Sequence, residues 1–414
     1  MKIVSFHTLG CKLNFAETST VSRLFAENGY SRVAFGQPAN VVVINTCTVT
    51  AQSDRKCRQA ITKAVKTSPE AIVVVIGCFA ELKNAEIAAI PGVDIVLGNK
   101  EKFDIIEKIR DKNEGVRMKN EELKIENFTS SFSLHDRTRS FLKVQDGCDY
   151  HCAYCTVPMA RGSSRNAPIA DIVSQAQIIA GKGVKEIVLT GVNIGDFGKT
   201  TGETFLQLLR ALDDVAGIER VRTGSIEPNL ITEEIVELIA GSTRIAPHFH
   251  IPLQSGSNAI LGLMARRYNS EQFAEKVALI HSHIPHAAIG VDVIVGFPGE
   301  TDEYFNETYT FIENLNIAYL HVFKYSERPG TKSIALPNKV QPAIAEQRSK
   351  KLLTLSDIKK NIFEQQNTGQ TRQVIFEQNA KNGFMTGFTE NYIKVEAPYN
   401  ELMIGKVVKV EFLK

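Results

Sequence analysis

Residues 148–155 read CDYHCAYC, so Cys148, Cys152 and Cys155 form a CxxxCxxC spacing, here named the loop set. Three thiolates in one loop supply three corners of a cubane iron–sulfur cluster and leave the fourth iron open to another ligand. An open coordination position indicates chemistry rather than structural support. The alternative is a structural zinc site, which normally has four closed ligands, and His151 completes no evident tetrahedral set.

The chain has 414 residues, enough for two or three domains at about 150 residues each. Its 48 Lys and Arg and 46 Asp and Glu residues leave a formal charge of +2, so charge alone indicates neither a nucleic-acid nor a membrane partner. Seven cysteines cannot all pair as disulfides. The N-terminus has no export-signal pattern and no run of about 18 apolar residues occurs, so we expect a cytoplasmic protein without a membrane partner.

A second set of cysteines is dispersed along the first part of the chain. Short apolar runs predict strands of a parallel sheet at 2–6, 41–45 and 72–76. Cys11, Cys47 and Cys78, here named the dispersed set, each follow one of these runs by five residues or fewer. Because the carboxyl ends of parallel strands meet at one edge of a sheet, we expect a second three-cysteine cluster there. The alternative is three unrelated thiols.

The stretch between the first two runs has a helical pattern. Asn14 is expected to cap the start of this helix and Gly29 to end it. The seventh cysteine, Cys57, belongs to neither set. We expect it to be a free thiol on a helix and assign it no role.

The whole pattern predicts an α/β protein with domains at residues 1–127, 137–366 and 369–414. The first is a parallel α/β domain, followed by a charged linker at 111–136 without helical period. The second has apolar runs at intervals too long for hairpins, as in a partial α/β barrel with sites at the C-terminal ends of its strands. The third has short alternating runs with Gly and Asn turns, typical of a small antiparallel β-barrel. The apolar runs of the second domain lie at 140–145, 185–190, 219–225, 247–252, 290–295 and 317–323.

CxxxCxxC with Tyr154 before its last cysteine is the signature of the radical S-adenosylmethionine (SAM) enzymes. Further motifs are LGCKLNFAET, VVVINTCTVT, IVVVIGCFAE, VPMARGSSRN, LTGVNIGDFG, RTGSIEP, IPLQSGS and VIVGFPGET. Together they resemble the methylthiotransferase branch of that superfamily over essentially the whole chain. The resemblance implies an N-terminal methylthiotransferase domain, a radical-SAM partial barrel and a C-terminal TRAM domain. GCKLN followed by ET, and NTCTVTAQSDRKCRQ, are most similar to the bacterial members that methylthiolate N6-threonylcarbamoyladenosine in tRNA.

The resemblance also implies two [4Fe-4S] clusters and SAM as cofactors. The loop-set cluster would chelate SAM at its fourth iron and cleave it to methionine and a 5′-deoxyadenosyl radical. The dispersed-set cluster would carry the sulfur to be inserted, one SAM methylating this sulfur and a second supplying the radical. Both clusters would then face one substrate cavity. The implied SAM contacts, each otherwise an ordinary turn or strand-end residue, are Tyr154, Thr190, Gly191, Ser225, Glu227, Val295 and Gly296.

The implied substrate is adenosine 37 of a tRNA anticodon loop, whose exposed bases reach a cavity at little cost. The C-terminal barrel is the expected holder of this loop, although residues 369–414 have only six basic against five acidic side chains. Phe388 and Tyr392 are candidates for base stacking, with a place in the barrel core as the alternative. Four arginines are candidates for phosphate or carboxylate contacts, or else for solvated surface or internal salt bridges: Arg137, Arg139, Arg161 and Arg165.

The expected partners of the chemistry are an electron donor, such as flavodoxin or ferredoxin, and a sulfur donor that the sequence does not identify. One alternative function is methylthiolation of another tRNA adenosine or of a ribosomal-protein side chain. A second is a non-catalytic RNA-binding protein that metal ions stabilise at both cysteine sets.

His248 and His250 share one side of a predicted strand, but no third ligand follows at suitable spacing, so we expect them to line the barrel or its core.

Overall fold

The computed structural model describes residues 2–114, 128–134 and 138–413. The chain divides into two compact units. The first contains residues 1–136, 146–150 and 155–165, and the second contains residues 137–145, 151–154 and 166–414. None of the described helices combines the length and the apolar character that crossing a membrane requires.

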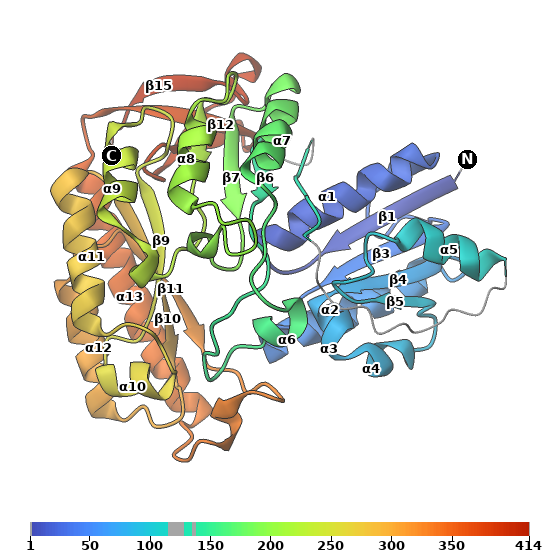
Figure 1. Ribbon diagram of the computed structural model, residues 1–414, viewed down its shortest axis with the longest axis horizontal. Coiled ribbons are helices and arrows are strands. Elements are labelled where there is room, and N and C mark those ends of the chain that lie inside the picture. Colours follow the sequence, from blue (N-terminus) through green and yellow to red (C-terminus); the bar gives the residue numbers. More distant parts are fainter. Residues whose placement is uncertain (1, 115–127, 135–137, 414) are drawn as a thin grey trace. The chain divides into compact units, whose positions relative to one another are not determined.

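The first unit is built on a parallel sheet in the order β2-β1-β3-β4-β5. Its strands are β1 (Lys2–Thr8), β2 (Tyr30–Val33), β3 (Val41–Thr46), β4 (Ile72–Gly77) and β5 (Ile95–Leu97). On one face lie α1 (Lys12–Glu27) and α5 (Ile105–Asn113), and on the other lie α2 (Ala51–Thr67), α3 (Cys78–Leu82) and α4 (Asn84–Ala88) (Figure 1). Every residue of β3 is buried, because this central strand has helices on both sides.

The three strands predicted in this unit are confirmed as β1, β3 and β4. The predicted helix cap is wrong, since α1 begins at Lys12 with Cys11 in the N-cap position. Asn14 lies inside the helix, where its Nδ2 donates to the carbonyl oxygens of Leu9 at 2.7 Å and Thr46 at 3.0 Å. Its amide therefore joins the loop after β1 to the end of β3 instead of capping α1.

The second unit begins with parallel strands that alternate with helices. The strands are β6 (Ser140–Lys143), β7 (Glu186–Thr190), β8 (Arg220–Arg222), β9 (His248–Gln254), β10 (Ala288–Val295) and β11 (Tyr319–Lys324). They form two sheets, β6-β7-β8 and β9-β10-β11. Two parallel bridges join these sheets, one between Val221 and Ile245 and one between Ser225 and His250. This is the predicted partial α/β barrel, and each of its predicted strands is confirmed.

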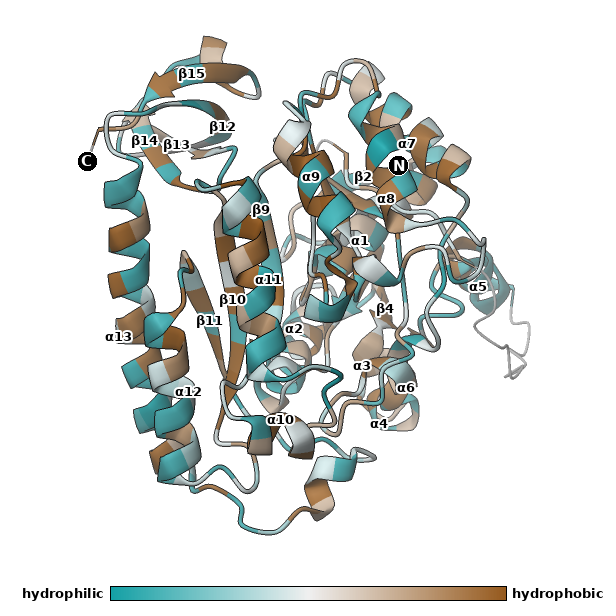
Figure 2. Cartoon of the chain, turned by 60° about the vertical axis from the view of Figure 1, so that its left-hand side comes forward, coloured by the Kyte–Doolittle hydropathy of each residue, from teal (hydrophilic) through white to brown (hydrophobic). Residues whose placement is uncertain are grey.

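Helices surround these strands. They are α7 (Ile169–Gly181), α8 (Phe205–Asp213), α9 (Glu233–Gly241), α10 (Asn258–Leu263), α11 (Ser270–His283), α12 (Asp302–Asn314) and α13 (Pro342–Gln366), while α6 (Val157–Arg161) belongs to the first unit. In Figure 2, β10 is mostly hydrophobic whereas α12 and α13 alternate in hydropathy, as expected for helices with one face on a sheet and one in water. Short 3-10 helices lie at Ile194–Asp196, Pro228–Leu230, Lys332–Ala335 and Glu401–Met403.

The chain ends in an antiparallel sheet in the order β14-β13-β12-β15. Its strands are β12 (Thr371–Lys381), β13 (Phe384–Thr389), β14 (Lys394–Pro398) and β15 (Val407–Glu411). This sheet confirms the expected antiparallel C-terminal region. Phe376 and Met385 of the sheet share an apolar core with Phe363 of α13 and with Ala288 and Ala318 of the barrel. The domain limits predicted from the sequence stay predictions, and most of the predicted linker lies outside the described residues.

Candidate metal and cofactor sites

The dispersed set lies at the carboxyl ends of three neighbouring strands. Cys11 occupies the N-cap position of α1 after β1, Cys47 directly follows β3, and Cys78 is the first residue of α3 after β4. Burial is the largest of the causes that raise the pKa of Cys47 to about 11, and the neighbouring Cys11 and Cys78 contribute to this rise. All three cysteines thus lie at the edge of the sheet where the sequence analysis expects the second cluster.

Glycines let the loops that carry these cysteines approach closely. Gly10 has a φ of +104°, and a Cβ there would lie 2.6 Å from the Cβ of Cys47. Gly77 has a φ of +99°, and a Cβ there would lie 2.4 Å from Oδ1 of Asn45. A side chain at either position would push the strand ends apart and separate the thiols.

A buried network of ion pairs, here named the ion network, lies beside the dispersed set. Arg161, only 2% exposed, contacts Glu17 at 3.1 Å and Asp146 at 2.9 Å. Lys102 contacts Glu17 at 2.6 Å, and Arg165 contacts Asp146 at 3.0 Å. Among the described residues, these three cations face two carboxylates, and the excess of positive charge suits thiolate ligands and an anionic cluster.

Two asparagines connect the ion network to the thiols. Asn14 Oδ1 accepts from Arg161 Nη2 at 2.7 Å and from the Sγ of Cys11 at 3.8 Å. Asn99 Nδ2 lies 3.6 Å from the Sγ of Cys78, and its Oδ1 accepts from Lys102 at 2.8 Å. Sequence reasoning assigned no such role to either residue, although Asn14 lies within the motif LGCKLNFAET.

Each sulfur of the loop set accepts a hydrogen bond. The backbone N–H of Tyr150 donates to Cys148 at 3.4 Å, and that of Val157 donates to Cys155 at 3.4 Å. The Nη1 of Arg266 donates to Cys152 at 3.1 Å. Hydrogen bonds to thiolate sulfurs help to set the reduction potential of an iron–sulfur cluster, so this donor set fits the predicted cofactor.

Arg266 also joins two of the predicted SAM contacts. Its Nη1 lies 3.5 Å from the hydroxyl of Tyr154, and its Nη2 forms an ion pair with Glu227. Burial raises the pKa of Cys152 while Arg266 opposes this rise, and the same two causes act on the pKa of Glu227. The sequence analysis did not identify Arg266, because its partners are more than a hundred residues away or lie on another strand end.

The other predicted SAM contacts lie at the carboxyl ends of barrel strands. Thr190 ends β7 and Val295 ends β10, with Gly191 and Gly296 directly after them, and Ser225 follows β8. A Cβ on Gly191 would lie 2.7 Å from Ile194 and 2.8 Å from Oε1 of Gln145, so only glycine fits this turn. The N–H of Gly296 already donates to Glu300 at 2.7 Å, which leaves its carbonyl oxygen for a ligand.

Two buried polar atoms at the end of β7 have no hydrogen-bond partner among the described residues. They are Oγ1 of Thr190 and Nδ2 of Asn193. Buried polar groups in proteins are almost always paired, so these two atoms would pair with water or with a polar ligand. Such a ligand at this position agrees with the predicted SAM contact at Thr190.

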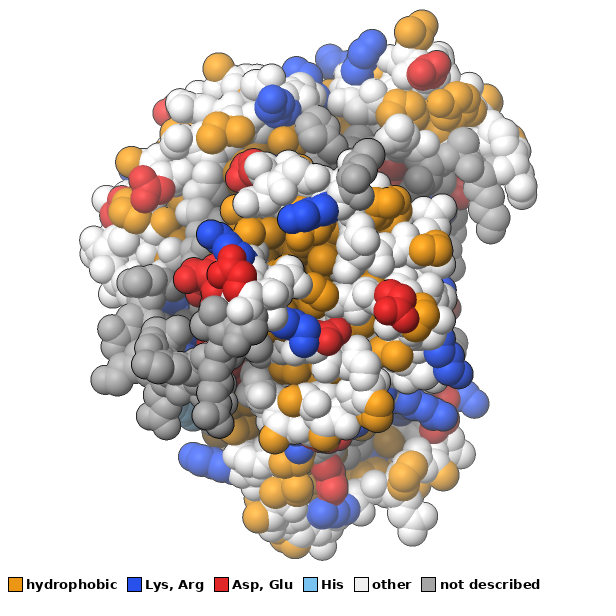
Figure 3. Space-filling model, turned by 90° about the vertical axis from the view of Figure 1, so that its right-hand side faces the viewer, with side chains coloured by type: hydrophobic (Ala, Val, Ile, Leu, Met, Phe, Trp, Pro, Cys, Tyr) orange, Lys and Arg blue, Asp and Glu red, His pale blue; other side chains and the backbone are white. Residues whose placement is uncertain are grey.

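The predicted substrate residues have partners within the chain. Arg161 and Arg165 belong to the ion network, and Arg139 contacts Glu377 at 2.6 Å, so the alternative of internal salt bridges describes these three. Arg137 lies outside the described residues. On the face drawn in Figure 3, the coloured basic and acidic side chains are interspersed and form no broad field of one sign.

The two candidate stacking residues contact other rings of the chain. Phe388 and Tyr392 stack on each other with centroids 5.0 Å apart at an angle of 19°. The guanidinium of Arg139 lies 5.0 Å from the ring of Phe388, and that of Arg222 lies 4.9 Å from the ring of Tyr392. His248 approaches the ring of Tyr392 to 4.5 Å. Both rings thus pack where the C-terminal sheet meets the barrel.

Comparisons with known proteins cover the whole chain. The model of the uncharacterized protein family UPF0004 matches residues 3–98, and that of the Radical SAM superfamily matches residues 142–312. Threonylcarbamoyladenosine tRNA methylthiotransferase MtaB of Bacillus subtilis is 41% identical over 100% of this chain and 94% of its own. tRNA-2-methylthio-N(6)-dimethylallyladenosine synthase of Sulfurihydrogenibium is 32% identical over 98% and 95%.

A solved structure shares the fold. It is the radical SAM methyltransferase TsrM from Kitasatospora setae with cobalamin and a [4Fe-4S] cluster bound, which superimposes with a TM-score of 0.60 at 16% identity over 80% of this chain and 77% of its own.

Proposed function

Because the chain belongs to the radical SAM methylthiotransferase family, we propose that it converts N6-threonylcarbamoyladenosine at position 37 of tRNA to the 2-methylthio derivative. Membership confirms the resemblance that the motifs predicted. It also makes an iron–sulfur cluster and SAM the cofactors of this enzyme.

The observation that carries the choice of substrate is the full-length match to MtaB of Bacillus subtilis, whose name states this nucleoside. The relative from Sulfurihydrogenibium, named for a dimethylallyladenosine, is less similar. Both relatives match at least 98% of this chain, and their names differ in the adenosine derivative that they state.

In this proposal the loop set holds a [4Fe-4S] cluster with SAM at its open iron. The bound cluster and SAM supply a carbon-centred radical when an electron donor such as flavodoxin or ferredoxin reduces them. The chain orients this pair: Arg266 fixes Cys152, Tyr154 and Glu227, and the unpaired Thr190 Oγ1 offers a hydrogen bond to the polar end of SAM.

The dispersed set holds a second [4Fe-4S] cluster, which supplies the sulfur for methylthiolation. The ion network supports this role, because its described members carry more positive than negative charge and two asparagines connect them to Cys11 and Cys78. Arg161 and Arg165 then act as positioning residues for the cysteine loops. A sulfur donor must replenish this cluster. Because its substrate in this proposal is tRNA, we expect the enzyme in the cytoplasm.

The deciding experiment is mass spectrometry of tRNA nucleosides from a strain that lacks the gene. We expect the 2-methylthio form of N6-threonylcarbamoyladenosine to disappear, and a plasmid copy to restore it. A copy with Cys148→Ala should not restore it, whereas the matched control Cys57→Ala should. Unchanged nucleoside levels in the deletion strain would exclude this substrate, and loss of a different methylthioadenosine would assign the chain to that nucleoside instead.

The purified enzyme provides a second test. Anaerobic reconstitution should load about eight irons per chain if both sets hold four-iron clusters. A colourless protein that binds zinc at both sets would instead support the non-catalytic RNA-binding alternative.

A further inference from the structure

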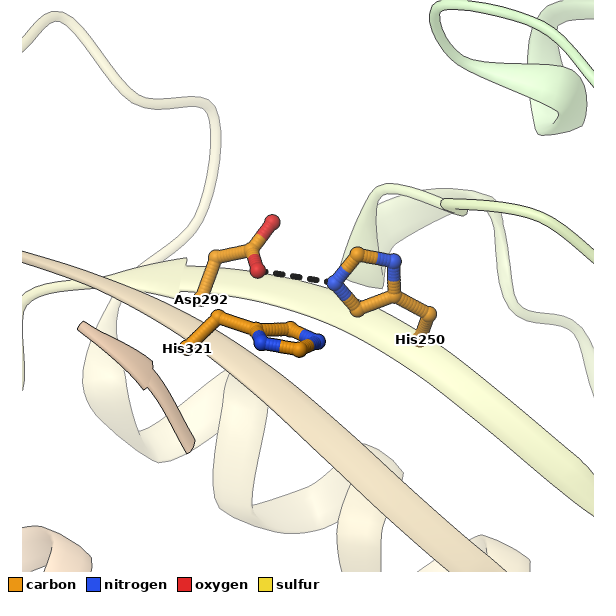
Figure 4. Close-up of side chains that lie close together, drawn as sticks. All are labelled: His250, Asp292 and His321. Carbon is orange, nitrogen blue, oxygen red and sulfur yellow. Dashed lines mark hydrogen bonds and ion pairs between the residues drawn. The ribbon is translucent and has the colours of Figure 1, made fainter. Parts of the chain in front are cut away.

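Three metal-ligating side chains meet in the barrel, and none of them belongs to either cysteine set. They are His250 of β9, Asp292 of β10 and His321 of β11, and one ligand atom of each lies within 4.8 Å of the other two (Figure 4). The sequence analysis found no third ligand for the histidines of β9, because Asp292 and His321 are 42 and 71 residues from His250.

The strand register holds these side chains on one face of the sheet. Asp292 pairs directly with His321, and His250 pairs with Gly290, two residues before Asp292. Side chains alternate along a strand, so Gly290 and Asp292 share a face. The intervening Val291 is fully buried on the opposite face.

The neighbouring layer of the barrel supports this arrangement. A Cβ on Gly290 would lie 2.3 Å from the ring of Tyr319. The missing side chain of this glycine therefore leaves the space on β10 that the ring occupies. The hydroxyl of Tyr319 bonds to Nε2 of His248 at 2.8 Å. The ring of Tyr319 in turn packs edge to face on that of His321, with centroids 5.2 Å apart.

The geometry is near that of a coordination site. Nε2 of His250 lies 2.8 Å from Oδ1 of Asp292, and the rings of His250 and His321 meet edge to face at 81° with centroids 5.4 Å apart. The side chains of His250 and Asp292 are 22% and 18% exposed, and His321 is exposed, so an ion can reach all three ligands from solvent.

Two imidazoles and one carboxylate are ligands that first-row transition metals prefer. Calcium and magnesium would require more oxygen ligands than this group offers. A second group with three potential ligands, Glu233, Glu237 and His283, lies on helices, and its two carboxylates are exposed. That second group has no strand register to fix it and serves below as a control.

We propose that His250, Asp292 and His321, which belong to neither cysteine set, bind one divalent transition-metal ion in the barrel. Three protein ligands leave further coordination positions for a neutral nitrogen or oxygen donor, such as a ring nitrogen of a base. The site does not depend on which nucleoside the enzyme modifies.

Equilibrium dialysis of the cluster-loaded enzyme against Ni²⁺, followed by elemental analysis, tests the site. Wild-type enzyme should retain about one Ni²⁺ per chain with its iron unchanged. Asp292→Asn and His321→Gln should each weaken binding at least about tenfold, since loss of even an outer partner of a ligand typically costs that much. The control His283→Gln should bind like wild type. Equal binding by Asp292→Asn and wild type, or loss of binding in His283→Gln alone, would overturn the proposal.

Wild-type enzyme gives an answer even if these variants fail to fold. Ni²⁺ should protect His250 and His321 together from diethyl pyrocarbonate, as peptide mass spectrometry of the modified histidines would show, while His283 reacts as before. Equal modification of His250 and His321 with and without Ni²⁺ would reject the site.

Discussion

Each of the two cysteine sets brings three thiols together, but the two sets do so in opposite ways. The loop set lies within eight residues, and its sulfurs accept two backbone hydrogen bonds and one from Arg266. The dispersed set spans 68 residues, and three parallel strands and a buried ion network bring it together. A contiguous site therefore depends on local spacing, whereas a dispersed site depends on the sheet and on the charges beside it.

The largest expected effect separates the two sets by function. Cys152→Ala should abolish SAM cleavage, whereas Cys47→Ala should preserve SAM cleavage and abolish the methylthio product. Each variant should lose about four of about eight irons. Iron analysis and chromatography of 5′-deoxyadenosine measure both outcomes. If Cys47→Ala lost SAM cleavage while the loop set kept its iron, the division of labour between the sets would be wrong.

The next effect concerns the ion network beside the dispersed set. Glu17→Gln should lower the unfolding free energy by about 3–5 kcal/mol, because Arg161 and Lys102 lose a buried counter-charge. The matched control is Glu86→Gln, whose partner Arg58 is 43% exposed and whose loss should cost less than about 1 kcal/mol. Denaturant unfolding compares the two, and equal costs would show that burial of the ion network contributes nothing.

A smaller effect tests the hydrogen bond to the loop set. Arg266→Met should lower the reduction potential of the loop-set cluster by an amount on the order of tens of millivolts, since the donor to Cys152 stabilises the more negative reduced state. Iron content should stay unchanged. Arg267→Met removes the neighbouring charge from an exposed side chain and should shift the potential less. A redox titration that gave identical potentials for wild type and Arg266→Met would contradict this role.

The smallest effect concerns the seventh cysteine, which the structure confirms as a free thiol on a helix, α2. Burial raises the pKa of Cys57 to about 12, so the thiol stays protonated at pH 8 and should resist iodoacetamide in the folded enzyme. Cys57→Ala should cost about 1 kcal/mol and leave the iron content unchanged. Rapid alkylation of Cys57 in native enzyme would show that this thiol is accessible.

Most of the fold could be predicted because its strands are apolar runs of ordinary length. The short edge strands β2 and β5 were not predicted, since three or four residues carry little periodic signal. The position of Asn14 was misjudged for a different reason. Its side chain suits a helix cap, but two carbonyl groups from separate strand ends offered stronger tertiary partners.

The candidate sites divide in the same way. Residue type and spacing identified both cysteine sets, whereas the partners of Arg139, Arg161 and Arg165 could not be read from the sequence. The same holds for Phe388 and Tyr392, whose ring contacts come from the packing of the C-terminal sheet on the barrel. For such side chains the sequence does not distinguish one partner from another, because it does not show which side chains are buried, and solvation and pairing depend on burial.

The sequence by itself determined the family, the two cysteine sets and the order of strands and helices, because each depends on residues near one another or on repeated local patterns. Only the tertiary structure decided which charges and imidazoles meet. Arg161 and Glu17 are 144 residues apart, and the ligands of the proposed metal site come from three strands. Contacts of this kind depend on the register and packing of whole elements, which no local pattern encodes.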